Sequence, residues 1–275
     1  MRFRTSFLCA CLAAALATGC AKQPQLVAGP IAPTAFAGID LWRPGPFEEG
    51  YVVPRGPLAG RTIEVERIED IVLGEKEVVI TFDDGPMPGK TNRILDTLDE
   101  YGVKATFLMV GQMARAYPQT AGEVAARGHT VGTHTERHAN LTQLDFDDAL
   151  AEIEEGRRHV AAAVAPRSAA PFFRFPYLAD TTALRRALAD RGIVVIDADI
   201  DSKDYFVSTP EQVRDRALAR VEQHGSGIIL FHDIHARTAA MLPEFLEGLK
   251  ERDYKVVRLV PRLRAPELLL SFHGG

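Results

Sequence analysis

A repeating order of strand, helix and glycine is the feature that most constrains the fold of this chain. From about residue 77 onward, short β-rich apolar stretches alternate with amphipathic helical stretches, and Gly102, Gly128, Gly192 and Gly225 follow the ends of helical stretches. Glycine takes the left-handed position after a helix at low cost. Strand, helix, glycine and strand in this order is typical of parallel β/α units. We expect strands near 78–82, 104–110, 129–133, 171–175, 193–199, 227–231 and 255–260, and helices near 90–101, 113–127, 145–164, 181–191, 209–224 and 238–251.

Periodicity alone does not separate an open doubly wound sheet from a closed barrel, but the polar residues favour the barrel. Five polar clusters each follow an expected strand: TFDDGP, GTHTERH, RFPY, DIDSKDY and FHDIH. A β/α barrel gathers its active site at the C-terminal ends of its strands, whereas an open sheet would gather fewer of these clusters at one point. The sequence therefore predicts an α/β fold, a distorted barrel with about seven parallel strands.

The N-terminus resembles an export signal. Arg2 and Arg4 precede an apolar stretch, from Phe7 to Ala17, that is short for a bilayer span. We read residues 1–20 as a lipoprotein-type signal peptide in which Cys20 becomes lipidated, with ordinary cleavage nearby as the alternative. All three cysteines lie in this segment, so we expect no disulfide in the mature chain.

Composition bounds the remaining chain. We interpret residues 21–70 as an N-terminal linker or wrapping arm, 71–262 as the catalytic domain and 263–275 as a C-terminal tail. The net charge of −5 and the absence of a basic run with interleaved aromatic residues argue against nucleic acid as a partner. No protein partner is evident.

Two adjacent carboxylates and two spaced histidines indicate a metal site. Asp83 and Asp84 stand at the end of a strand, where like charges are unfavourable unless they are solvated or a cation lies beside them. His134 and His138 are four residues apart and can share a cation on a tight turn. If the first and third strands bring their ends together, Asp84 completes a site of two histidines and one aspartate. The other reading is a solvated turn and two surface histidines.

The five clusters, in this order, resemble the motifs of the polysaccharide deacetylase family (NodB homology, carbohydrate esterase family 4). The similarity spans roughly residues 76–260 and implies a NodB-like deacetylase barrel that uses a divalent metal, with Zn²⁺ expected. It implies that Asp84, His134 and His138 hold the metal, that Asp83 is the general base, and that a bidentate Arg174 keeps this base ionised.

The resemblance also implies the remaining roles. Tyr177 would offer its backbone N–H to an oxyanion hole and contact substrate, and His232 would be the general acid, paired with Asp204. The fourth motif of the family normally ends in tryptophan. Here Tyr205 stands at that position, and we expect it to line the substrate site. We expect the other histidines to be surface or loop residues: His129, His159, His224 and His235.

These residues together predict an exported, lipid-anchored hydrolase of the periplasm or cell envelope. It would remove N-acetyl groups from amino sugars of an envelope polysaccharide, with N-acetylglucosamine of peptidoglycan as the leading candidate, and release acetate. The alternatives are an O-deacetylase of the acetyl-xylan type and a glycan-binding lipoprotein without turnover. His232 distinguishes the N-deacetylase from the O-deacetylase, because the leaving group of an ester departs more easily than that of an amide and depends less on a general acid.

Overall fold

The computed structural model describes residues 56–165 and 169–262. The expected signal peptide with Cys20, most of the expected N-terminal arm and the C-terminal tail lie outside the described residues. Among the residues described, no helix combines the length and the apolar character needed to cross a bilayer.

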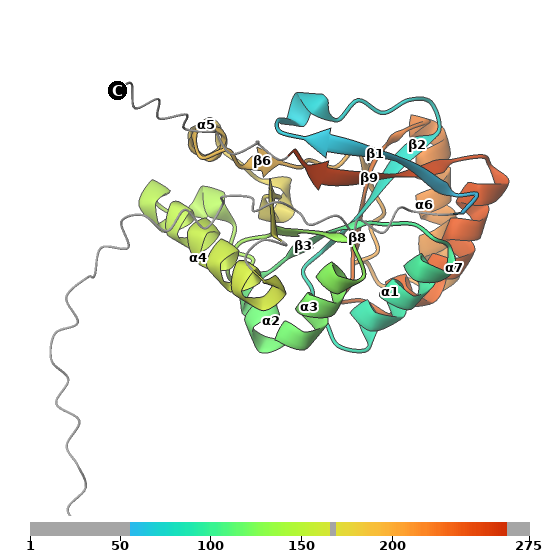
Figure 1. Ribbon diagram of the computed structural model, residues 1–275, viewed down its shortest axis with the longest axis horizontal. Helices are drawn as coiled ribbons and strands as arrows, with labels where there is room; N and C mark the ends of the chain where they lie inside the picture. The colour runs from blue at the N-terminus through green and yellow to red at the C-terminus, as the bar shows by residue number, and fades with distance from the viewer. Residues whose placement is uncertain (1–55, 166–168, 263–275) are drawn as a thin grey trace, which may run out of the picture. The chain divides into compact units, whose positions relative to one another are not determined.

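Seven short parallel strands curve into a partly closed barrel with helices around it (Figure 1). Its strands are β2 (Glu77–Asp83), β3 (Thr106–Met109), β4 (Thr130–Thr133), β5 (Ala169–Phe173), β6 (Val194–Val195), β7 (Ile200–Asp201) and β8 (Gly227–His232). The pairing runs from β7 through β8, β2, β3, β4 and β5 to β6, and each recorded pair is parallel. No pairing joins β6 to β7 within the described chain, so the barrel is open there. The predicted distorted β/α barrel is confirmed.

Two further strands extend the sheet beside β2. The strands β1 (Ala59–Val65) and β9 (Lys255–Pro261) pair in parallel along most of their length, and β9 meets only the first two residues of β2. The last expected strand therefore forms, but its main neighbour is β1 rather than a barrel strand. Residues 59–65, part of the expected N-terminal arm, enter the sheet because Ile63 and Val65 are buried while Thr62 and Glu64 alternate with them toward solvent.

The helices follow the predicted pattern with one exception. They are α1 (Lys90–Glu100), α2 (Gly111–Ala116), α3 (Pro118–Ala126), α4 (Phe146–Val164), α5 (Thr182–Asp190), α6 (Pro210–His224) and α7 (Ala236–Glu251), with short 3-10 turns η1 (Ile68–Asp70), η2 (Leu141–Gln143) and η3 (Pro176–Leu178). The expected helix 113–127 is two helices. Pro118 has no N–H for an interior hydrogen bond, so it begins α3 instead of continuing α2. Likewise, the expected strand 193–199 is replaced by the separate two-residue strands β6 and β7.

Alternation along β2 decides which of its side chains face the barrel interior. Ile80 and Phe82 pack in the large core between strands and helices. Val79 packs in a second cluster with residues of β3, β5, β6 and β8 and of β1 and β9, so this side of β2 faces the barrel interior. Because side chains alternate along a strand, Thr81 and Asp83 share the inward side with Val79. The barrel thus places a polar pair at the C-terminal end of its own core.

Candidate metal and catalytic site

The strand register brings the polar clusters to one end of the barrel. Asp83, the last residue of β2, lies beside Leu108 of β3 and beside His232, the last residue of β8. The residues just after β4 and β5 reach the same end, because Thr133 and Phe173 are paired there. Four of the five motifs therefore end at the C-terminal face, and Asp204 of the remaining motif, DIDSKDY, joins them through its hydrogen bonds with His232.

Arg174 is fully buried and anchors Asp83. Its Nη1 donates to Asp83 Oδ1 at 2.8 Å and to the hydroxyl oxygen of Thr81 at 2.7 Å. The remaining guanidinium nitrogens donate to the backbone carbonyls of Ile196 and Asp197. The expected bidentate pair is therefore wrong: one nitrogen serves Asp83, and the others tie the arginine to the chain after β6.

The electrostatics of Asp83 suit a base. Burial raises the pKa of Asp83 above its ordinary value, and the positive charges of Arg174 and His232 offset part of this rise. A carboxylate whose pKa is moved toward neutrality accepts a proton more readily than an exposed one. Arg174 also fixes Oδ1, which leaves Oδ2 directed to the neighbouring histidine, 3.8 Å from His134 Nε2.

Asp84, His134 and His138 form a compact triad. Asp84 Oδ1 lies 3.7 Å from His134 Nε2 and 3.4 Å from His138 Nε2, and the two imidazole centroids are 4.9 Å apart. One ligand atom from each residue falls within 4.8 Å of the others. The structure thus brings together the three residues that the sequence predicted as metal ligands.

The triad fits a divalent cation. His134 Nδ1 lies 2.8 Å from the carbonyl oxygen of Arg174, and the bond it donates there leaves Nε2 with its lone pair toward Asp84. Burial lowers the pKa of His134 to about 3, so the ring is neutral, as a ligand must be. Asp84 Oδ1 is buried without a hydrogen-bond partner among the described residues. Two imidazole nitrogens and one carboxylate oxygen are a donor set that zinc accepts, with positions left open.

The backbone around the triad is strained. Asp84, Thr135 and His138 have φ values of 78°, 65° and 58°. A left-handed conformation costs a residue other than glycine about 1 kcal/mol or more, and it is rare for a β-branched side chain such as threonine. Such strain persists only where surrounding contacts hold it. The segment between the two histidines is therefore expected to have firm external support.

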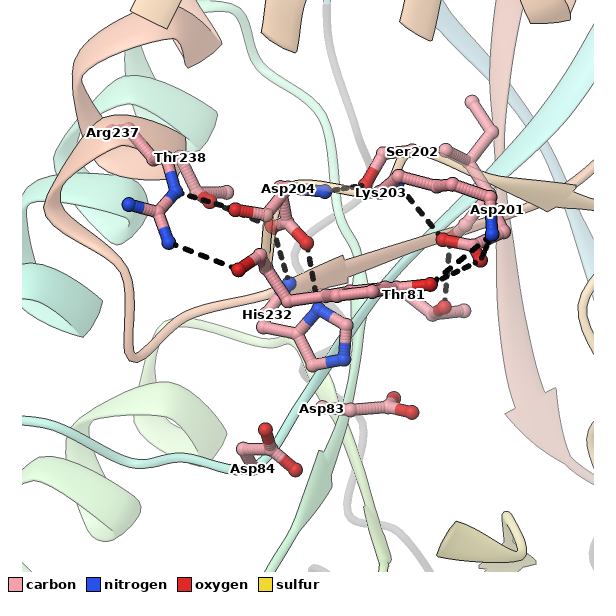
Figure 2. Close-up of polar contacts among 12 residues, drawn as sticks. Thr81, Asp83, Asp84, Asp201, Ser202, Lys203, Asp204, His232, Arg237 and Thr238 are labelled. Atoms are coloured by element: carbon pink, nitrogen blue, oxygen red, sulfur yellow. Dashed lines mark hydrogen bonds and ion pairs between the residues drawn. The ribbon is translucent and has the colours of Figure 1, made fainter. Parts of the chain in front are cut away.

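His232 and Asp204 form a second charged pair. His232 Nδ1 lies 2.7 Å from Asp204 Oδ1, and Asp204 Oδ2 accepts from the backbone N–H of His232 and from the hydroxyl of Thr238. Figure 2 shows the His232 ring with Asp204 on one side and the Asp83–Asp84 pair on the other. Arg237, also in Figure 2, donates to the carbonyl of Asp204 and fixes this loop.

The pair has a clear protonation state. Burial opposes the charge on His232, but the hydrogen bond and the charge of Asp204 outweigh it and raise the pKa of His232 to about 9. Burial likewise opposes ionisation of Asp204, yet the bonds from His232 and Thr238 leave its pKa below the ordinary value. An imidazolium therefore faces the carboxylates across the site at neutral pH.

The two expected substrate residues flank this centre. Tyr177 is 66% exposed in a left-handed conformation, and its ring lies 4.7 Å from that of His138. Tyr205 is 40% exposed, and its ring meets that of His232 edge-on at 5.5 Å. Its hydroxyl donates to Asp201. Both aromatic side chains are therefore open to a ligand, and their roles stay predictions.

Some site residues carried no role in the sequence reading. Asp233 is 1% exposed and accepts from the hydroxyl of Thr91 at 2.6 Å, and a Cβ at Gly85 would overlap its carboxylate. Asp233 directly follows His232 in the motif FHDIH, and this position was the sequence feature that could have indicated a role in the site. Thr81 could have been found from the inward alternation of β2. His129, expected near the surface, is buried, and its Nδ1 accepts from the N–H of Ala105, which is a structural role.

Comparisons with known proteins agree with this geometry. A family model described as "Polysaccharide deacetylase" matches residues 71–196. The chain is 31% identical over 196 residues to the peptidoglycan-N-acetylmuramic acid deacetylase PdaC of Bacillus subtilis, covering 71% of this chain and 40% of that protein. It is 31% identical over 195 residues to a chitin deacetylase of Colletotrichum lindemuthianum, covering 66% of this chain and 76% of the relative. The chain thus spans less than half of the first relative and most of the second.

Solved structures share the fold. A peptidoglycan deacetylase of Bdellovibrio bacteriovorus aligns with a TM-score of 0.65 and 36% identity over 75% of this chain and 57% of its own. A pseudoenzyme of the same family from Bacillus anthracis, 23% identical, aligns over 70% and 69% with a TM-score of 0.63, which shows the fold alone. From the shared sequence, fold and motif order, this chain belongs to the polysaccharide deacetylase family.

Proposed function

We propose that this protein is a metal-dependent N-deacetylase that hydrolyses N-acetyl groups of an envelope glycan, with N-acetylglucosamine of peptidoglycan as its substrate. The observation that carries the proposal is the presence of a buried carboxylate, Asp83, and a protonated imidazole, His232, on neighbouring strand ends beside the triad of Asp84, His134 and His138. Amide hydrolysis needs both a base and an acid. Relatives named as peptidoglycan deacetylases support the substrate class.

Asp84, His134 and His138 would hold the metal ion. When bound, the ion would act as a Lewis acid that polarises the acetyl carbonyl and lowers the pKa of the attacking water. Asp83 accepts a proton from this water while the water oxygen bonds to the acetyl carbon. Arg174 holds one oxygen of Asp83 in place, so the other oxygen stays directed into the site.

His232 completes the reaction on the leaving side. Its Nδ1 is engaged by Asp204, so the transferable proton is on Nε2. As the C–N bond breaks, the nitrogen keeps the electron pair and takes this proton, which yields acetate and a free amino sugar. The backbone N–H of Tyr177 would donate to the carbonyl oxygen as negative charge develops there, and the ring of Tyr205 would line the sugar.

Acetate release from purified peptidoglycan tests this proposal. The protein without residues 1–20 is stripped of metal, reloaded with zinc and compared with Asp84→Asn. We expect zinc-dependent acetate from the wild-type protein and at least about 100-fold less from the variant. No acetate from the zinc-loaded wild-type protein would contradict the peptidoglycan assignment.

The assay also separates amides from esters. Replacing His232 by alanine removes the acid, so cleavage of an N-acetylated oligosaccharide should fall by about 100-fold or more, while an O-acetyl ester should lose far less. If the wild-type protein cleaves only the ester, the protein is an O-deacetylase. If it binds glycan and zinc but releases no acetate from either substrate, it is a binding protein.

We also propose that the protein works in the cell envelope, anchored through a lipid on Cys20. The support is the sequence Ala17 to Cys20 and the family of envelope-acting relatives. This segment lies outside the described residues. A tethered enzyme reaches substrate only within the length of its linker, which agrees with a wall polymer as substrate.

A further inference from the structure

The three residues between the two triad histidines, Thr135, Glu136 and Arg137, are called the ligand turn below. They lie against helix α4, and α4 in turn packs against α2 on the outside of the barrel (Figure 1). In α4, Glu152, Gly156 and His159 are spaced by four and three residues, so they share one face of the helix. Each of them meets one residue of the ligand turn.

Two of these contacts use buried carboxylates. Glu152 is 3% exposed, and its Oε2 accepts from the backbone N–H of Arg137 at 3.1 Å while its other oxygen pairs with the arginine side chain. Glu136 is 4% exposed, and its Oε2 lies 2.8 Å from His159 Nδ1. A buried carboxylate is costly without such partners, so both bonds hold the turn to the helix.

The third contact depends on the absence of a side chain. Gly156 lies against the backbone of Thr135, and a Cβ at this glycine would overlap the carbonyl group of Thr135. The first N–H groups of α2 also bind the turn, because Gly111 donates to the carbonyl of Thr135 at 2.9 Å and Gln112 to that of Glu136 at 3.0 Å. The left-handed Thr135 is thus in contact with both α2 and α4.

We propose that Glu152, Gly156 and His159 position the ligand turn and thereby set the affinity of the triad for its metal ion. The inference rests on the proposed metal-dependent function. None of the three touches the triad nitrogens, so they act by fixing the separation and direction of His134 and His138. Groups that orient ligands in this way commonly change metal affinity by about 10- to 100-fold when they are removed.

A matched pair of glycine variants gives the first test. Gly156→Ala forces the ligand turn away from α4, whereas Gly122→Ala in α3 places its Cβ at an ordinary 3.5 Å from a backbone oxygen. Zinc affinity is measured by competition with a chromophoric chelator, and folding by circular dichroism and thermal unfolding. We expect zinc to bind about tenfold or more weakly to Gly156→Ala and unchanged to Gly122→Ala.

His159 gives a second test that does not depend on a clash. His159→Ala removes the hydrogen bond between His159 Nδ1 and Glu136 and leaves the longer ion pair of Glu136 with Arg115, at 3.8 Å, so the zinc affinity should fall by about tenfold. His159→Gln can still donate to Glu136 and should restore most of the affinity. A role in folding alone would lower the unfolding temperature and leave the zinc affinity of the folded protein unchanged, which would overturn the inference.

The ligand variant His138→Ala separates this inference from the proposed function. If His138→Ala binds zinc like the wild type, the triad is not the metal site and both proposals fail. If only His138→Ala loses affinity, while Gly156→Ala and His159→Ala keep it, the inference alone fails. A second bound zinc that disappears in Glu155→Gln would show that Glu136, Glu155 and His159 hold a metal themselves, and would also overturn the positioning role.

Discussion

The charge of Asp204 should control the alkaline limb of the pH–rate profile through His232. The pKa of His232 is raised from about 6.5 to about 9, so the folded protein favours the imidazolium by about 2.5 pKa units, or about 3 kcal/mol. Asp204 is the largest of the groups that raise it, and burial acts in the opposite direction. In Asp204→Asn, we therefore expect the pKa to return to about 6.5 or lower.

The sign and size of the effect follow from the protonated fraction. The acid must be protonated to act, so wild-type activity should be lost as the pH rises through about 9. At pH 8 the fraction of protonated His232 falls from about nine-tenths to about one-thirtieth in the variant, so kcat/KM should fall by at least roughly 30-fold. At about pH 5.5 both proteins hold the proton, and this part of the loss should vanish.

The assay is acetate release from a soluble N-acetylated oligosaccharide between about pH 5 and pH 10. Asp215→Asn is the matched control, because Asp215 is exposed on α6 and pairs with Arg214, away from the site. An alkaline limb that stays near pH 9 in Asp204→Asn would refute the role given to this carboxylate.

Further predictions concern stability, metal content and anchoring. Arg174→Lys should destabilise the protein by about 2–4 kcal/mol in urea unfolding, because lysine cannot satisfy all the buried acceptors that the guanidinium serves; an unchanged midpoint would contradict this. In the metal-free protein, the raised pKa of His232 contributes stability that is complete below about pH 6.5 and is lost as the pH rises through about 9. The free energy of unfolding should therefore fall by about 3 kcal/mol over that window, and His232→Asn should remove this slope. Asp84→Asn should remove zinc, read by metal analysis, and keep the unfolding temperature of the metal-free protein; full zinc content would exclude Asp84 as a ligand. Cys20→Ser should abolish incorporation of labelled palmitate in cells, and continued labelling would disprove the lipid anchor.

The barrel could be predicted because two signals agree. Apolar stretches of strand length alternate with helical stretches, and polar clusters follow the strands at the end where a barrel gathers its site. The division of the expected helix 113–127 at Pro118 could also have been predicted, since proline favours the first turn of a new helix. The strands β6 and β7 could not be predicted as separate strands, because two residues are too few to show a periodic pattern. The sequence also does not show that β9 pairs mainly with β1.

The sequence predicts which residues form the site better than it predicts the hydrogen bonds that they make. Asp84, His134 and His138 come together as expected because β2 and β4 end at one face. Arg174 meets Asp83 as expected, but its other partners could not be predicted, because they depend on the strand register that places Thr81 and the carbonyl of Ile196 beside it. His159 resembles a solvent-facing helical residue until the fold brings it to Glu136.

The most direct test of the central claim is to measure zinc content and acetate release on the same preparation of Asp83→Asn. Asp83 and Asp84 are neighbours in sequence, yet the structure gives one to Arg174 and the other to the two histidines. The account predicts one zinc ion per chain, as in the wild-type protein, and a fall in acetate release of about 100-fold or more. Loss of zinc from Asp83→Asn, or acetate release close to that of the wild type, would contradict it.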